Sequence, residues 1–143
     1  MTRSAQVQIQ RATRATRLPS DLQFRRWAKA AHAGTLDVTV RIVGTREGQE
    51  LNRRFRGRDY ATNVLTFVYE GTASALCGDI VLCAPVVRRE ALAQGKSLDA
   101  HYAHLLVHSI LHLSGHDHED DADAARMEHA ERLILARLGY ADP

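Results

Sequence analysis

Hydrophobic and polar positions follow two different periods along the chain, and each change of period marks a predicted boundary between secondary-structure elements. Two-residue alternation over 6–10, 37–43 and 63–69 is typical of half-buried strands, and the apolar run over 79–83 is typical of a central strand. Apolar residues three and four apart predict the helices, which cover 20–34, 46–56, 85–94, 97–113 and 120–138.

Residues with capping chemistry stand at the ends of these helices. Ser20 with Gln23 forms a capping-box pattern, and Ser97 can cap the fourth helix. Gly95 and Gly115 stand where helices end, because glycine adopts positive φ without strain. The sequence therefore predicts an α/β (α+β) fold, with a mixed sheet of about four strands covered by about five helices in a single domain over 1–143.

Composition agrees with one globular domain. The 143 residues are 45% hydrophobic and 25% charged, as in ordinary globular proteins. No run of eighteen apolar residues and no signal-peptide h-region occurs, so we expect a cytoplasmic protein without a membrane partner. Cys77 and Cys83 flank a predicted strand that would separate them by roughly 20 Å, too far for a disulfide.

Charge is unevenly distributed along the chain. Residues 1–58 hold 13 Lys and Arg against 4 Asp and Glu, a balance of +9, whereas residues 59–143 hold 6 against 13, a balance of −7. The densest basic cluster comprises Arg53, Arg54, Arg56 and Arg58. These arginines are candidates for binding phosphates of nucleic acid, and the alternative is a solvated helix face.

Four histidines fall within residues 108–118, HSILHLSGHDH. His108 and His112 are four apart, so a helix places them on one face, where they can share a metal ion. Gly115 can reverse the chain and bring in His118 as a third ligand. Three imidazoles with an open fourth position predict a catalytic Zn²⁺ site, one per chain. Structural histidines are the alternative, and His116 competes with His118 as the third ligand.

The histidine spacing matches that of metzincin proteases, which leaves open a metal-dependent hydrolase of peptides. However, Ser109 follows the first histidine, where that chemistry requires a glutamate as the general base. The metal site is therefore kept, and the protease is demoted to an alternative.

Four blocks of the sequence resemble the bacterial YbeY endoribonucleases, also called rRNA maturation factors. The family signature H-G-x-L-H-L-x-G-Y-D-H is similar to residues 108–118, with Ser109 and His116 as departures. The other blocks lie in family order and are Leu51–Phe67, Gly78–Val81 and Leu138–Tyr140.

This resemblance implies a zinc-dependent, single-strand-specific endoribonuclease that acts on the 3′ end of small-subunit rRNA and in ribosome quality control. Single-stranded rRNA and the small ribosomal subunit with its proteins are the implied partners. Arg56 matches the family's important arginine and is the candidate for stabilising the charged transition state, with a salt bridge to Asp59 as the alternative. Arg53, Arg54 and Arg58 would hold flanking phosphates.

Two carboxylates are candidates for orienting the metal ligands. Asp117 can accept an imidazole N–H, and Asp79 can either do the same or support the sheet. No general base is evident beyond Asp117 or Glu119. A noncatalytic ribosome-assembly module that uses the basic cluster remains a third hypothesis.

Overall fold

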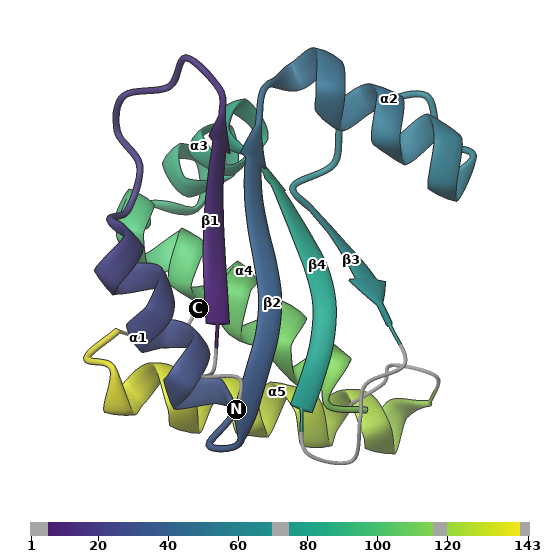
Figure 1. Ribbon diagram of the computed structural model, residues 1–143. Helices are drawn as coiled ribbons and strands as arrows, with labels where there is room; N and C mark the ends of the chain where they lie inside the picture. Colours follow the sequence, from purple (N-terminus) through teal and green to yellow (C-terminus); the bar gives the residue numbers. More distant parts are fainter. Residues whose placement is uncertain (1–5, 70–74, 116–119, 141–143) are drawn as a thin grey trace.

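A four-stranded mixed sheet and five helices make up the computed structural model, which describes residues 6–69, 75–115 and 120–140 (Figure 1). The strands are β1 (Gln6–Ala12), β2 (Thr35–Val43), β3 (Val64–Val68) and β4 (Ala75–Cys83). The helices are α1 (Asp21–Ala31), α2 (Thr45–Arg56), α3 (Ala84–Gln94), α4 (Leu98–Leu113) and α5 (Asp121–Arg137). The predicted α+β class and the numbers of strands and helices are confirmed.

The sheet has the strand order β1-β2-β4-β3, in which only β3 is antiparallel to its neighbour. Helices α1, α4 and α5 lie on one face of the sheet, and α2 lies beside the β3–β4 end (Figure 1). The main core is built between the sheet and the helices of the first face, around Phe24, Trp27, Ile80 and Leu106. A second, smaller core contains Leu65, Val81 and Cys83, with Leu51 of α2 packed against it.

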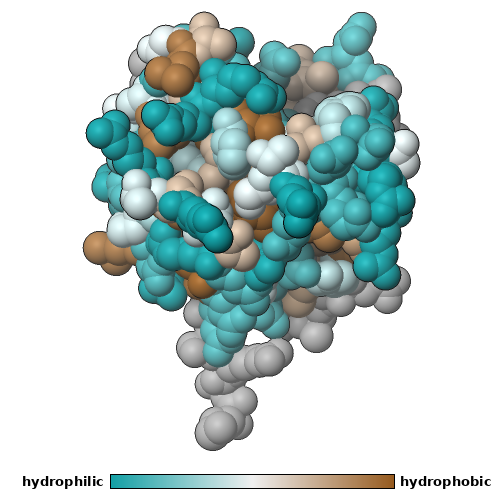
Figure 2. Space-filling model, turned by 90° about the horizontal axis from the view of Figure 1, so that it is seen from above, coloured by the Kyte–Doolittle hydropathy of each residue, from teal (hydrophilic) through white to brown (hydrophobic). Residues whose placement is uncertain are grey.

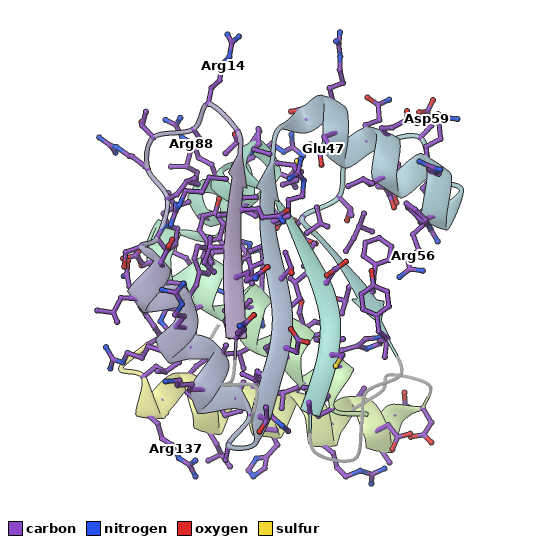
Figure 3. All side chains as sticks on the ribbon, viewed as in Figure 1. Arg14, Glu47, Arg56, Asp59, Arg88 and Arg137 are labelled. Atoms are coloured by element: carbon purple, nitrogen blue, oxygen red, sulfur yellow. The ribbon has the colours of Figure 1, made fainter. Side chains whose placement is uncertain are left out.

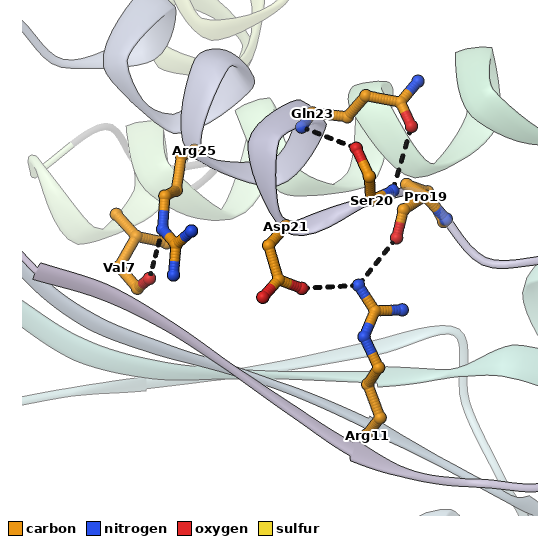
Figure 4. Close-up of polar contacts among 7 residues, drawn as sticks. All are labelled: Val7, Arg11, Pro19, Ser20, Asp21, Gln23 and Arg25. Atoms are coloured by element: carbon orange, nitrogen blue, oxygen red, sulfur yellow. Dashed lines mark hydrogen bonds and ion pairs between the residues drawn. The ribbon is translucent and has the colours of Figure 1, made fainter.

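The start of α1 illustrates how local sequence sets a helix boundary. Ser20 and Gln23 form the predicted capping box, because the Ser20 hydroxyl accepts from the Gln23 backbone N–H at 3.2 Å and the Gln23 side chain accepts from the Ser20 N–H at 2.9 Å (Figure 4). Arg11 of β1 donates to the carbonyl of Pro19 at 2.9 Å and to Asp21 at 2.6 Å. These bonds join the first turn of α1 to the end of β1.

Strand β4 begins four residues earlier than its apolar run predicted, at Ala75 rather than Asp79. Gly78 lies inside this strand, and a Cβ atom there would stand 2.5 Å from the Leu113 side chain and 2.7 Å from the Phe67 carbonyl oxygen. The absence of a side chain therefore lets the last turn of α4 pack against the sheet at this point. No helix in the described ranges is long and apolar enough to cross a bilayer.

Candidate functional site

Helix α4 carries three histidines on one stripe. Ser97 caps the helix by accepting from the Ala100 N–H at 3.1 Å, and α4 then runs to Leu113. His104, His108 and His112 are successive positions four residues apart, and each side chain is partly exposed although most of α4 is buried. Gly115 follows with φ of +100°, which agrees with the predicted chain reversal.

A buried carboxylate from α5 bonds to two of these histidines. Glu131 is only 6% exposed, and its Oε1 atom contacts His108 Nδ1 in a short hydrogen bond. Its Oε2 atom lies 3.4 Å from His104 Nε2. A neutral His108 that donates through Nδ1 carries its lone pair on Nε2, which is the arrangement found in carboxylate–histidine–metal sites.

Glu131 stays ionised across the physiological pH range. Burial alone would raise its pKa, but the hydrogen bonds from His104 and His108, together with attraction to both rings, lower the pKa of Glu131 to about 2. The fixed negative charge favours imidazole orientations in which an N–H points at the carboxylate. It therefore restricts how His108 can rotate.

Sequence reasoning missed Glu131, although its position contained a signal. It lies four residues after Met127 and four before Leu135, both of which are buried on α5. A charged residue within the apolar stripe of an amphipathic helix is rarely buried unless it has partners. Its partners lie 23 and 27 residues away in sequence, so the spacing within α5 does not identify them.

A second carboxylate holds the first histidine of α4. His101 is buried, and its Nε2 atom lies 2.9 Å from Glu90 Oε1 of α3, a carboxylate that also accepts from Asn63 at 3.0 Å. Burial lowers the pKa of His101, opposed by its hydrogen bond to Glu90. The Lys96 ammonium lies 3.3 Å from His104 Nδ1, and burial lowers the pKa of Lys96.

The predicted third ligand, His118, lies outside the described residues, as do His116, Asp117 and Glu119. Within the described ranges, no group of three or more histidine, cysteine, aspartate or glutamate side chains could hold a metal ion. The pair His108 and His112, with Glu131 behind the first ring, fits two of the three nitrogen donors of the predicted zinc site. The three-histidine site therefore stays a prediction.

Arg56 ends α2 and extends to the edge of β3 (Figure 3). Its Nη2 atom donates to the Thr66 carbonyl at 3.0 Å, and its guanidinium lies 5.6 Å from the centre of the Phe67 ring. Asp59 instead accepts a hydrogen bond from Gln49 at 3.1 Å. Among the residues described, Arg56 has no ion pair, so its charge is available to an anionic ligand.

The other three arginines of the basic cluster differ in their contacts. Arg53 donates to both carboxylate oxygens of Glu50, at 2.7 and 2.9 Å, so an internal acid partly neutralises it. The Arg54 guanidinium lies 5.5 Å from the Phe55 ring centre. Arg58 donates to the Tyr60 hydroxyl at 3.3 Å. Within the described part of the chain, neither Arg54 nor Arg58 forms an ion pair, which makes them better candidates for phosphate binding than Arg53.

Asp79 of β4 accepts a hydrogen bond from the Tyr69 hydroxyl at 2.6 Å. This bond raises the pKa of Tyr69. Asp79 pairs with Phe67 across the β3–β4 ladder, so its side chain lies on the same face of the sheet as the Phe67 ring. Two roles were predicted for Asp79, orienting a metal ligand or supporting the sheet, and the bond to Tyr69 favours the second.

Contacts between α4 and the sheet relate the histidines to Arg56. Leu113, which follows His112, packs against Gly78, and Gly78 pairs with Val68 at the end of β3. Arg56 contacts Thr66 and Phe67 of the same short strand. The end of the histidine-bearing helix and the end of α2 therefore meet the β3–β4 part of the sheet from opposite faces.

A pocket of about 930 Å³ lies at the end of the sheet where the parallel strands β1, β2 and β4 finish. It is lined mainly by small apolar residues and by Arg14, Arg88 and Arg89. Figure 2 looks down on this end of the molecule, where hydrophobic surface is visible between hydrophilic side chains. None of the candidate site residues lines the pocket, so it is separate from the histidine stripe.

The fold and these side chains define an α+β protein in which a buried helix carries a histidine stripe and an arginine at the end of α2 contacts the edge strand β3. The sequence matches the family model described as Endoribonuclease YbeY over residues 3–139. This chain belongs to the YbeY family.

Individual relatives agree with the family model. The chain is 61% identical over 132 residues to the Endoribonuclease YbeY of Azoarcus sp. (strain BH72), covering 87% of this chain but only about half, 52%, of that protein. It is 55% identical over 138 residues to the protein of the same name from Aromatoleum aromaticum, covering 94% of this chain and 89% of the relative. For the Nitrosomonas eutropha relative, identity is 54% over 135 residues, covering 94% and 95%.

A solved structure supports the same fold. The solution structure of TM1509 from Thermotoga maritima superimposes with a TM-score of 0.55 and covers 96% of this chain and 98% of its own. Its sequence is 22% identical, so the likeness concerns the fold alone.

Proposed function

We propose that this protein is a zinc-dependent, single-strand-specific endoribonuclease that acts in rRNA maturation, at the 3′ end of small-subunit rRNA, and in ribosome quality control. Family membership supports the reaction class, because the curated relatives are named endoribonucleases. The observation that carries the metal dependence is the bond between Glu131 and His108 on the histidine-bearing helix. The cytoplasm and the small ribosomal subunit are the corresponding compartment and partner.

His108, His112 and His118 are the residues that would hold the metal. When bound, Zn²⁺ supplies the Lewis acidity that makes water nucleophilic near neutral pH. Glu131 fixes His108 in the tautomer that leaves Nε2 for the metal. Because the three imidazole ligands would be neutral, the zinc ion would keep its full charge of +2, which a carboxylate ligand would reduce.

The arginines of α2 would bind the RNA. Arg56 is anchored by the Thr66 carbonyl, yet its planar guanidinium keeps further N–H donors for a phosphate. In this position it would stabilise negative charge that develops on the scissile phosphate during in-line attack. Arg54 and Arg58 would bind neighbouring phosphates, whereas Arg53 is held by Glu50.

One set of measurements tests the proposal. Elemental analysis of the purified full chain is expected to give one zinc per chain, and single-stranded RNA is expected to be cleaved unless a chelator is present. His112→Ala is expected to lose both zinc and cleavage, whereas His129→Ala, at an exposed histidine of α5, is expected to retain both.

Two outcomes would contradict the proposal. Intact RNA in the presence of stoichiometric zinc would exclude the nuclease, and cleavage of casein without cleavage of RNA would favour the peptide hydrolase. The noncatalytic ribosome-assembly module predicts that His112→Ala supports ribosome maturation in cells while charge reversal at Arg53 and Arg54 abolishes it.

A further inference from the structure

The exposed aromatic side chains of the molecule are concentrated near the end of α2. In the described residues, the large aromatic side chains classed as exposed are Phe55, Tyr60 and Tyr69, at 50%, 52% and 52%. The other exposed large hydrophobic residues, apart from Val68, are the leucines Leu22, Leu92 and Leu133, each on a different helix. Three aromatic rings within fifteen residues form a local surface rather than scattered exposure.

One ring contact and one hydrogen bond relate Phe55 and Tyr69 to the same face of β3. Phe55 of α2 packs edge-on against Phe67, with ring centres 5.2 Å apart. Tyr69 lies two residues beyond Phe67, and its hydroxyl reaches Asp79, which pairs with Phe67. Phe55, Phe67 and Tyr69 therefore follow one another from the end of α2 along β3.

The same surface carries positive charge without carboxylate partners. Arg54 lies over the Phe55 ring, Arg56 over the Phe67 ring, and Arg58 bonds to the Tyr60 hydroxyl. Among the residues that the structure describes, none of the three arginines forms an ion pair. The two nearby carboxylates, Asp59 and Asp79, accept hydrogen bonds from Gln49 and Tyr69. A ligand that matches this surface is anionic and also has flat faces that can stack.

We propose that Phe55, Phe67 and Tyr69, together with Arg54 and Arg58, form a base-stacking surface that holds unpaired bases of single-stranded RNA. Aromatic side chains on RNA-binding sheets stack bases in this way, and stacking tolerates any base because every base has a π face. The rings of Phe67 and Tyr69 arise about 7 Å apart along the strand, twice the 3.4 Å rise of stacked bases. A strand whose bases are not stacked on each other can place one base on each ring at this spacing.

This inference deepens the proposed function, because it names how unpaired RNA is held and why the rings cannot hold a duplex. Bases in a duplex are paired and stacked on each other, so their faces are unavailable to the rings. The arginines bind phosphates in either form of RNA, whereas the rings discriminate between them. Single-strand preference therefore arises from aromatic stacking rather than from charge.

Binding measured by fluorescence anisotropy, with a labelled 12-nucleotide RNA in the presence of a chelator, tests the inference without cleavage. Phe55→Leu and Tyr69→Leu remove a ring but keep an apolar side chain, and each is expected to weaken binding about 5- to 100-fold. Tyr69→Phe keeps the ring and loses only the bond to Asp79, so it is expected to bind like the wild type. Leu92→Ala, at an exposed leucine of α3, is the control for loss of surface hydrophobicity.

Two further measurements separate stacking from charge. The ring variants are expected to keep the wild-type salt dependence and the wild-type affinity for duplex RNA, because no phosphate contact is lost. Wild-type protein is expected to bind an RNA with abasic positions more weakly than the intact RNA, a measurement that does not depend on any variant folding.

The inference is overturned if the ring variants bind single strands like the wild type, if they lose duplex binding equally, or if abasic RNA binds undiminished. The outcome is distinguishable from that of the proposed function. Ring-dependent binding without any cleavage would refute the nuclease alone, whereas cleavage that is indifferent to the rings would refute only the stacking surface.

Discussion

At the scale of single residues, Glu131 is the buried carboxylate that holds two histidines of α4 in place. A carboxylate behind a metal-binding imidazole raises its basicity and fixes its orientation. Glu131 contacts both His104 and His108, so one charge organises two successive turns of α4. It is buried and ionised, which costs free energy unless both oxygens are bonded, as they are here.

Replacing Glu131 by glutamine is expected to weaken zinc binding about 10- to 100-fold, because an amide has the same shape without the charge that raises the basicity of His108. Competition with a chromophoric chelator at constant pH measures the affinity. Glu128→Gln is the matched control, since Glu128 is exposed on the same helix. Equal zinc affinity of Glu131→Gln and wild type would show that Glu131 has only a packing role.

The residue scale also shows which parts of the site the sequence could reveal. The shared stripe of His108 and His112 on α4 was predictable because four-residue spacing on a helix is a local property, whereas their role as metal ligands stays a prediction. Glu131 was not, since it reaches His108 only through the packing of α5 on α4. Arg53 was grouped with its neighbours by charge, but its bond to Glu50, three residues away on the same helix, distinguishes it from Arg54 and Arg58.

At the scale of elements, helix ends were easier to predict than strand ends. Helix α1 begins after the predicted capping box, and Gly95 ends α3 with positive φ, because caps depend on a few adjacent residues. Strand β4 extends beyond its apolar run because its first four residues, Ala75–Gly78, pair with β2, and no local pattern encodes this pairing.

Gly78→Ala is expected to lower the free energy of unfolding by about 1–3 kcal/mol, because the new methyl group would overlap both Leu113 and a backbone carbonyl. Urea unfolding followed by circular dichroism measures the change. Gly44→Ser is the control, since no atom lies within 4 Å of a Cβ there and serine is a favourable N-cap for α2. Unchanged stability of Gly78→Ala would mean that α4 can move away from the sheet without cost.

At the scale of the whole molecule, the alternation of strands and helices gave the fold class but not the strand order. The chain places β4 between β2 and β3, so β2 and β4 pair although α2 and β3 separate them in sequence. Such pairing depends on how the helices pack on the two faces of the sheet, and this packing involves residues that are far apart in sequence. The buried aromatic cluster of Phe24, Trp27 and Tyr102 likewise joins α1 to α4 through edge-on contacts.

Stability of the whole molecule is expected to fall as the pH drops below about 6.5, the ordinary pKa of histidine. Burial lowers the pKa of folded His101, with Lys96 and His104 acting in the same direction and Glu90 opposing them. The unfolded chain therefore binds a proton more readily than the folded chain, and stability present above this pH is lost as the pH falls towards the folded pKa.

Urea midpoints measured between pH 8 and pH 5 check this prediction. His101→Gln is expected to reduce the decline, because glutamine does not titrate, whereas His129→Gln on the surface is expected to keep it. A decline of the same size in His101→Gln and wild type would assign the pH dependence to other groups.

The contact between Arg56 and Thr66 also covers part of the outer edge of β3. Asn63 and Tyr69 bond to β4, so the alternating pattern directs the Thr66 carbonyl away from the sheet, along an edge where no described residue forms a further strand. An exposed edge can recruit a strand from another copy, and a covering cation prevents it. Replacing Arg56 is therefore expected to expose this edge to pairing with another copy, in addition to removing the charge proposed to bind phosphate.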